Sequence, residues 1–345
     1  RMLSKKKILL FFYFFFTPIV IVFCLEFLLK IYFKSSKIPN ENRLKFRYML
    51  YSKDKVFDGH KNFFKYQPNL LSRHLLYYYE ENEFLKIWDY EFNTNNFGLV
   101  QKSDIFPNEN SILFLGDSFT QGQGASPWID NFKGEISGNQ IINGGIIGTG
   151  FQQFENIYDH INENFKIKKV VVIYIGGDLR RGVSTASDKN VLFIPDSKEE
   201  LDNLLIKEHN IRFKRKEKIK DRLKFFIRDL YVYNILRTQI NTFRLKNNEL
   251  IKRNLNSINS LFKKNDPNII FINVQTANEI ITGQESYETK LLNKFFAQNE
   301  YLNYKCDLSN DISNYHEIDY HPNTKGYNEL FECVKKIIQD NLIKS

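Results

Sequence analysis

The sequence predicts an α/β protein of three layers, in which helices cover both faces of a five-stranded, mainly parallel sheet. One N-terminal transmembrane helix is expected in addition. Two apolar runs, Ser111–Gly116 and Lys169–Gly176, end in glycine and are typical of strands buried on both faces. Segments of helical length separate such runs, as in α/β proteins. The helix is expected over the uncharged run Ile8–Leu25.

The length of 345 residues allows one large domain or two smaller ones, and the formal charge is +9. No two of the three cysteines form a C-x-x-C pair, which argues against structural zinc. Cys24 lies in the apolar run, so Cys306 and Cys333 are the only plausible disulfide partners. Two buried free thiols are favoured over that pairing.

Residues 1–34 are expected to form a cytoplasmic tip and a signal anchor, with membrane contact through residues 8–25. This run of eighteen uncharged residues follows Lys5–Lys7 and is just long enough to cross a hydrocarbon core. It offers no small residues for a cleavage site. The lysine cluster favours an N-terminus inside and a body exported to the periplasmic or extracellular side. A buried hydrophobic hairpin of a soluble domain is the alternative.

Residues 35–110 are interpreted as an N-terminal extension packed on the main domain. Tyr77–Tyr79 and Trp88–Phe92 have the composition of strands. His60 and His74 have no carboxylate or cysteine at ligand spacing, so we expect surface or packing roles for both.

The strand at Ser111–Gly116 leads directly into Asp117 and Ser118. Gly116 allows a sharp turn at the carboxyl end of the strand, where open α/β sheets place their ligands. Ser118 would begin the next helix, a good position for a nucleophile whose reaction develops an oxyanion. A serine that only caps the helix is the other interpretation.

Polar and glycine-rich residues also follow the later strands. A strand at Gln140–Ile142 precedes Asn143–Gly150, whose glycine order is wrong for a dinucleotide-binding fingerprint. The strand Lys169–Ile175 precedes Gly177 and Asp178. The remaining expected elements are strands at Asn268–Val274 and Tyr304–Leu308 and helices at Phe151–Phe165, Tyr287–Asn299 and Tyr327–Ile343.

Taken in order, these motifs resemble the blocks of the SGNH (GDSL-type) hydrolases, a family of flavodoxin-like α/β esterases and acyltransferases. Ile112–Ser118 resembles the first block, Asn143–Gly148 the second and Gly176–Asp178 the third. The pair Asp319 and His321, followed by Pro322 and Gly326 before the last helix, resembles the fifth. The resemblance extends over about 99–343, so that the SGNH-like domain would be 111–345.

The resemblance implies a triad of Ser118 as nucleophile, His321 as base and Asp319 as the group that orients the imidazole. His316 lies nearby without this context and is taken as incidental. No metal or organic cofactor is implied.

The resemblance also implies an oxyanion hole made by the backbone N–H groups of Ser118 and Gly148. The third block departs from the family, because Gly177 stands where the family has an asparagine and cannot donate from a side chain. The implied supporting residues are Asp117, Asn143 and Asp178.

Residues 183–265 form a long insertion, expected to be helical. The segment Arg212–Arg228 contains nine basic and two acidic residues. Apolar residues at helical spacing accompany them: Ile219, Leu223, Phe226, Leu230 and Tyr233. This basic helix 212–228 could bind anionic lipid or an acidic polymer, but a solvated face on a core-packed helix is preferred. Nucleic acid is a poor candidate, since no stacking or groove-reading motif accompanies the charge.

The function implied by the resemblance is acyl transfer from an ester of a cell-surface glycan or lipid to water or a sugar hydroxyl. Two alternatives stay open. The domain could be catalytically impaired and bind an acylated glycan or a partner protein, which the glycine at position 177 favours. The protein could also be a membrane-assembly component that contacts a partner through its insertion.

Overall fold

In the computed structural model, the chain divides into two compact units, Arg1–Lys45 with Leu204–Asn247 and Phe46–Asn203 with Asn248–Ser345. The structure describes residues 5–35, 46–80, 83–125, 127–136, 138–183, 191–214, 227, 230, 232–233 and 248–342. The second unit contains every residue of the predicted site.

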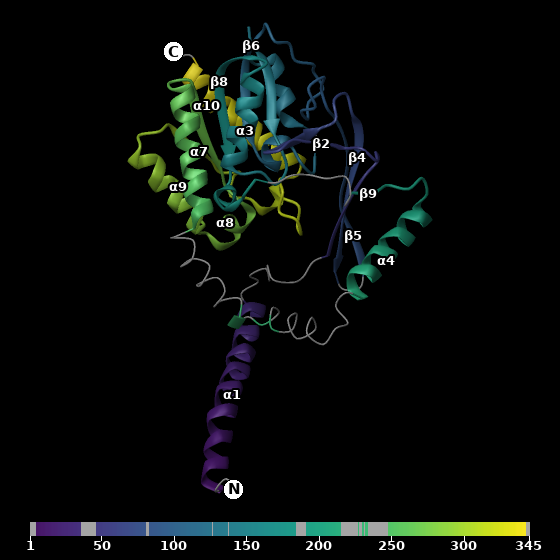
Figure 1. Cartoon of the computed structure of the whole chain (residues 1–345), viewed down its shortest axis with the longest axis vertical. Helices are drawn as coiled ribbons and strands as arrows, with labels where there is room; N and C mark the ends of the chain where they lie inside the picture. The colour runs from purple at the N-terminus through teal and green to yellow at the C-terminus, as the bar shows by residue number, and fades with distance from the viewer. Residues whose placement is uncertain are drawn as a thin grey trace. The chain divides into compact units, whose positions relative to one another are not determined.

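The larger sheet of the second unit has five strands in the order β11-β10-β8-β6-β7, and all neighbours are parallel. Its strands β6 and β8 are labelled in Figure 1. The strands are β6 (Asn110–Gly116), β7 (Gln140–Gly145), β8 (Lys166–Tyr174), β10 (Ile269–Val274) and β11 (Asn303–Cys306). The apolar runs of β6, β7, β8 and β10 are buried on both faces, as the sequence predicts for parallel strands, whereas only Cys306 of β11 is buried. The predicted five-stranded parallel sheet is therefore confirmed.

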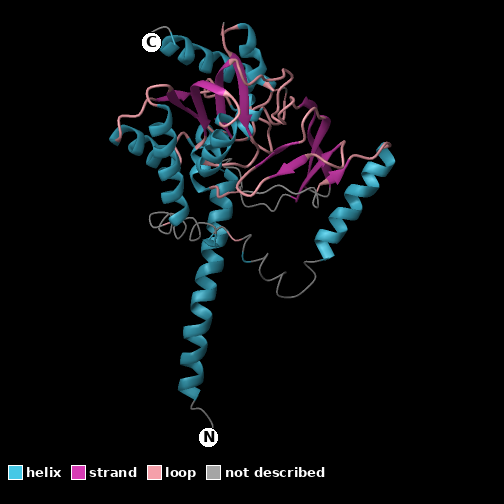
Figure 2. Ribbon diagram, turned by 45° about the horizontal axis from the view of Figure 1, so that its top comes forward, coloured by secondary structure: helices cyan, strands magenta, loops and turns pink. Residues whose placement is uncertain are grey.

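Helices cover both faces of this sheet (Figure 2). On one face the ring of Tyr174 contacts Phe151 of α3 and Phe296 of α9, at centroid distances of 5.4 and 5.5 Å. On the other face Phe114 packs in one cluster with Phe132 of η1 and Leu330 of α10. The helices are α2 (Ser118–Gln121), η1 (Trp128–Gly134), α3 (Phe151–Asn162), η2 (Gly176–Arg180), α7 (Glu249–Asn265), α8 (Ala277–Thr282), α9 (Tyr287–Gln298), η4 (Ile312–Asn314) and α10 (Thr324–Leu342).

The extension folds as a second sheet in the order β5-β4-β1-β9. Its strands are β1 (Phe46–Tyr51), β4 (Leu71–Glu80), β5 (Glu83–Asn93) and β9 (Leu192–Phe193), and β2 (Phe57–Gly59) pairs with β3 (Phe64–Tyr66) beside it. The insertion 183–265 is therefore not only helical: besides α4 (Lys198–Lys214) and α7, it supplies β9, which pairs parallel with β1.

The predicted transmembrane helix is not found. The run Ile8–Leu25 lies in the helix α1 (Lys5–Ser35), which contains Pro18. Among the helices of the described residues, none is long and apolar enough to cross a membrane. The uncharged run is at the lower limit of a spanning length, and Glu26 follows it directly. Glu26 is buried and accepts a hydrogen bond from the backbone N–H of Val232 at 3.1 Å.

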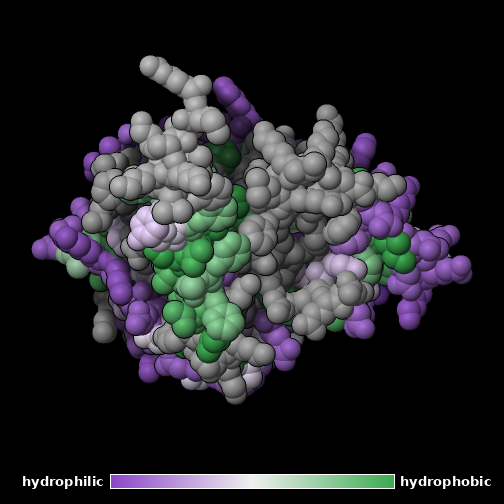
Figure 3. Space-filling view, turned by 90° about the horizontal axis from the view of Figure 1, so that it is seen from below, coloured by the Kyte–Doolittle hydropathy of each residue, from purple (hydrophilic) through white to green (hydrophobic). Residues whose placement is uncertain are grey.

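Apolar side chains of α1 are nevertheless exposed, among them Phe14, Val20 and Phe23. Figure 3 shows a patch of hydrophobic surface in the view from below. Most of the predicted basic helix 212–228 lies outside the described residues, including Ile219, Leu223 and Phe226.

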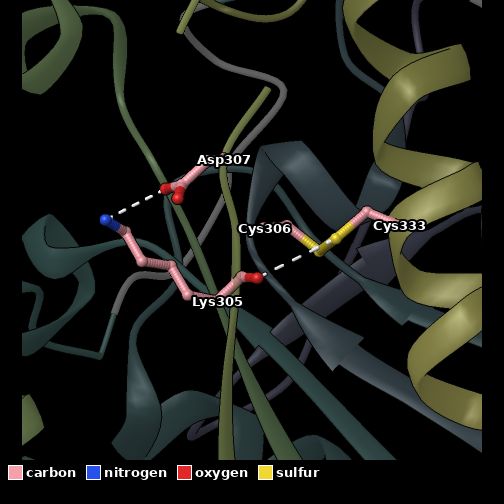
Figure 4. Close-up of a disulfide and its surroundings, with 4 residues drawn as sticks. All are labelled: Lys305, Cys306, Asp307 and Cys333. Carbon is pink, nitrogen blue, oxygen red and sulfur yellow. Dashed lines mark hydrogen bonds and ion pairs between the residues drawn. A yellow bond between two sulfur atoms is a disulfide. The ribbon is translucent and has the colours of Figure 1, made fainter. Parts of the chain in front are cut away.

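The preference for two free thiols at Cys306 and Cys333 is wrong. Cys306 ends β11 and Cys333 lies on α10, which packs beside that strand, so their Cα atoms are 5.9 Å apart and the two form a disulfide (Figure 4). The spacing of the two residues in the sequence could not show that a strand and a helix bring them together. Cys24 is a free, exposed cysteine.

Candidate active site

The loops that carry the predicted residues meet at one edge of the larger sheet. Ser118 follows β6, Gly148 follows β7 and Gly177 follows β8, and these three strands are neighbours with β6 in the middle. Because the strands are parallel, their carboxyl ends lie at the same edge.

The turn at the end of β6 requires glycine at position 116. A Cβ on Gly116 would lie 1.9 Å from Thr120 Oγ1 and 2.4 Å from the carbonyl oxygen of Ile173, so no other residue fits. Asp117 then caps α2 by accepting a hydrogen bond from the N–H of Phe119 at 2.9 Å. Ser118 is therefore held in a fixed orientation as the first residue of α2.

His321 lies directly opposite Ser118. Its Nε2 is 2.8 Å from Ser118 Oγ. The loop that carries His321 is tied back on itself, because the N–H of His316 donates to the carbonyl of His321 at 2.9 Å and Tyr315 forms an isolated bridge with Pro322. These backbone bonds keep the imidazole in reach of the serine.

Asp319 completes a continuous chain of hydrogen bonds. One carboxylate oxygen, Oδ2, bonds Nδ1 of His321, and the other, Oδ1, accepts from the hydroxyl of Tyr78 at 2.6 Å. Burial by itself would raise the pKa of Asp319, but the hydrogen bond and charge of His321, the charge of Arg47 and the bond from Tyr78 outweigh it. The pKa of Asp319 is held below its ordinary value, so the group is a carboxylate.

The loop after β7 leaves space next to the turn that carries Ser118. Gly148 is exposed, has a φ of 70°, and has no atom within 4 Å of the place where a Cβ would stand. Asn143 is buried and anchors the loop by accepting from the N–H of Gly145 at 3.0 Å. Gln121 of α2 accepts from the N–H of Ile147 at 3.0 Å, so α2 and this loop are bonded to each other.

Gly177 lies in η2, directly after β8, and is half-buried. A Cβ there would meet only the side chain of Ile175, at an ordinary contact distance of 3.7 Å, and Gly177 is not among the glycines with positive φ. Nothing in the backbone or its surroundings requires glycine at this position.

Two buried carboxyl groups and one arginine join the three loops. Arg181 Nη1 donates to Asp117 at 2.6 Å, to Asp178 at 2.5 Å and to the carbonyl of Thr149 at 3.1 Å. Burial, and then the charge of Asp117, raise the pKa of Asp178 well above its usual range, whereas Arg181 lowers it. Asp117 and Asp178 were predicted from the sequence as supporting residues, but Arg181 was not. The only feature of the sequence that could have indicated its ion pair with Asp178 is their three-residue spacing.

Residues of the extension form one side of the site. Trp88 of β5 packs against the rings of His321 and His316, with centroid distances of 5.6 and 5.5 Å. His316 itself bonds the carbonyl of Gly124 at 3.1 Å and is outside the hydrogen-bond chain of Ser118. Tyr78 and Trp88 could not be placed at the site from the sequence, because 243 and 233 positions separate them from His321 and no local motif marks such a contact.

The histidines of the extension have packing environments. His74 is buried, stacks on Tyr51 at a centroid distance of 4.4 Å and bonds the hydroxyl of Tyr90 at 3.2 Å. His60 stacks on Phe63 at 4.4 Å, but its Nε2 also lies 3.3 Å from Asp58 Oδ2, so the expectation of no carboxylate near His60 is wrong. Within the described part of the chain, no group of three or more histidine, cysteine, aspartate or glutamate side chains could hold a metal ion.

No family model and no curated protein matches the chain. Several solved structures, however, match it. A lipase/acylhydrolase from Enterococcus faecalis is 12% identical, with 67% of this chain and 96% of that chain covered and a TM-score of 0.36. A family 3 carbohydrate esterase from Clostridium thermocellum is 15% identical, covering 68% and 98%, with a TM-score of 0.38. Axe2, an acetylxylan esterase from Geobacillus stearothermophilus, is 11% identical, with 68% of this chain and 95% of that chain covered and a TM-score of 0.36.

Other matching structures are described as GDSL-type lipolytic proteins. These identities and TM-scores are too low to transfer the chemistry of those proteins to this chain. The chain is similar to solved GDSL-type esterases and acylhydrolases.

Proposed function

We propose that this protein is a serine-dependent ester hydrolase or acyltransferase of the SGNH type. The observation that carries the proposal is the unbroken chain from Ser118 Oγ through His321 to Asp319, with an Oγ–Nε2 distance of 2.8 Å. A nucleophile, a base and a group that orients the base are the parts that acyl transfer through a covalent intermediate needs.

In the proposed reaction, Ser118 Oγ attacks the acyl carbonyl while His321 Nε2 takes its proton. The tetrahedral intermediate collapses, the ester C–O bond breaks, and the leaving alcohol takes that proton from His321. Water or a sugar hydroxyl then attacks the acyl-enzyme, His321 accepts the new proton and returns it to Ser118 Oγ. Asp319 stabilises the charged imidazole throughout.

The developing oxyanion would be held by the backbone N–H groups of Ser118 and Gly148. The space beside Gly148 supports this role, since a substrate oxygen can approach the loop there. Asn143 and Gln121 would act indirectly, by fixing the loop that carries Gly148. The third donor of the family is absent at Gly177.

The proposed substrate is an acyl ester of a cell-surface glycan or lipid, and the proposed location of the body is outside the cytoplasm. The disulfide between Cys306 and Cys333 supports an oxidising compartment, because such bonds are rare where thiols are kept reduced.

A binding function without catalysis is the second candidate, and Gly177 is the observation that favours it. A site with a weakened oxyanion hole would retain an acylated glycan or a partner protein without turning it over. The intact bonds among Ser118, His321 and Asp319 favour the enzyme.

Turnover of p-nitrophenyl acetate by the purified protein tests the proposal. We expect activity in the wild type, loss in Ser118→Ala and His321→Gln, and most of the activity in His316→Gln. The two histidines are on the same loop, but only His321 bonds the serine. Equal rates for His321→Gln and His316→Gln would contradict the assignment.

A further inference from the structure

The carboxylate of Asp319 lies between two elements that are far apart in the sequence. Its Oδ2 bonds His321 on the same loop, and its Oδ1 accepts from Tyr78 on β4, 241 positions earlier, at 2.6 Å. Only 3% of its side chain is exposed. With both oxygens bonded, the carboxylate cannot rotate without breaking a buried hydrogen bond.

Tyr78 can act only as a donor here. Burial, and then the charge of Asp319, raise the pKa of its phenol, so the hydroxyl stays protonated wherever the enzyme works. A charge-assisted O–H···O⁻ bond of this length is stronger than a neutral one.

The second sheet fixes the phenol in place. Tyr78 is paired on both sides in β4, with Arg47 of β1 and Leu85 of β5, and it packs in a buried cluster with Leu76 and Trp88. Arg47 adds positive charge that acts on Asp319. The extension thus presents a rigid donor to the triad, which a mobile surface loop could not do.

We propose that Tyr78 is a positioning residue of this active site, through which the extension sheet orients Asp319 and thereby His321. The inference rests on the proposed function. When His321 takes the proton of Ser118, its Nδ1–H must point at Asp319, and the Tyr78 hydroxyl keeps the acceptor oxygen on that line. The extension is then a part of the catalytic apparatus rather than a spacer before it.

The variant Tyr78→Phe tests this proposal. The matched control is Tyr77→Phe, which removes a phenol hydroxyl from the adjacent, half-buried residue of β4. We expect Tyr78→Phe to lower kcat for p-nitrophenyl acetate about tenfold with KM within about twofold, the pattern of a lost transition-state interaction. Tyr77→Phe should change neither constant. Thermal unfolding of both variants shows whether the sheet is intact.

A double-mutant cycle with Asp319→Asn separates positioning from a general structural role. Labelling of Ser118 by a fluorophosphonate, which can be followed even when slow, serves as the readout. If Tyr78 acts through Asp319, adding Tyr78→Phe to Asp319→Asn changes the labelling rate by less than about twofold. The same tenfold loss in both backgrounds, or equal kinetics for Tyr78→Phe and Tyr77→Phe, would overturn the inference.

Failure of the proposed function has a different signature. In that case the wild type itself would not turn over the ester, whichever residue stands at position 78, and the inference would fall with it.

Discussion

At the scale of single residues, Gly177 decides how strong the proposed oxyanion hole would be. It is half-buried, has room for a Cβ and is not in the left-handed region, so an asparagine fits there without backbone strain. The neighbouring Arg180 bonds Glu288 through its Nε at 2.8 Å, and more than half of its side chain is exposed.

We therefore expect Gly177→Asn to raise turnover of an activated ester by at least about tenfold, since one oxyanion donor contributes about 10²–10³ in turnover elsewhere. Gly177→Ala, which adds a Cβ but no donor, is the control and should leave turnover unchanged. A folded Gly177→Asn protein with the rate of Gly177→Ala would contradict the account of the third block.

Arg181 and Arg180 give a second prediction at this scale, because Arg181 pairs with two buried carboxyls and Arg180, which is more exposed, pairs with one. Arg181→Met leaves the buried carboxyls of Asp117 and Asp178 without their cation and should destabilise the fold by about 3–5 kcal/mol at pH 7. Arg180 is more than half exposed and bonds the buried Glu288 through one ion pair, so Arg180→Met should cost less than Arg181→Met, which leaves two buried carboxyls without a cation.

Urea unfolding at several pH values provides the measurement. Burial and the charge of Asp117 already raise the pKa of Asp178, so lowering the pH protonates that group and relieves the repulsion in the variant. The deficit of Arg181→Met should therefore shrink as the pH falls. A deficit that grows on acidification would show that the carboxyls are not the cause.

The contact among the residues of the proposed triad could be predicted from the sequence because each of them stands in a short motif next to a strand end or the last helix. Tyr78 and Arg181 could not be predicted. The first depends on a strand-to-loop contact across 241 positions, and the second on three loops meeting at one sheet edge. The Tyr78 contact leaves no local pattern in the chain, and the three-residue spacing between Asp178 and Arg181 does not reveal the bonds of Arg181 to Asp117 and Thr149.

At the scale of elements, β4 connects the second sheet to the active site. His74, Leu76 and Tyr78 alternate along β4 and are all buried, as one face of a strand requires. Burial, and then the charge of Arg47, lower the pKa of His74 to about 3.

This pKa predicts how stability depends on pH. An unfolded chain binds the proton of a histidine below about pH 6.5, whereas folded His74 stays neutral until about pH 3, so the free energy of unfolding falls as the pH falls between these values. Between pH 7 and pH 4.5, the depressed pKa of His74 should lower the free energy of unfolding by about 2–3 kcal/mol. His74→Gln should lose that much less stability than the wild type over the same interval in urea unfolding. Parallel pH dependences would mean that His74 is protonated in the folded state.

The strands of the larger sheet could be predicted because buried parallel strands are continuous apolar runs, and the structure shifts their ends by only a few residues. β9 could not be predicted. It has two residues, and it is a strand only because β1 lies beside it.

At the scale of the whole molecule, the disulfide joins the last strand of the sheet to the last helix. Its two cysteines are 27 positions apart, so the bridge restricts the unfolded chain. The double variant Cys306→Ser, Cys333→Ser should lower the free energy of unfolding by about 2–4 kcal/mol in urea. Cys24→Ser, at an exposed free cysteine, is the control and should change nothing. Equal stability of the two variants would show that the bridge does not form in solution.

The central claim is that Ser118 is an activated nucleophile, and fluorophosphonate labelling of the full chain followed by peptide mapping tests it most directly. The account predicts one labelled peptide, containing Ser118, in the wild type and no label in Ser118→Ala or His321→Ala. Equal labelling of the wild type and Ser118→Ala would contradict it.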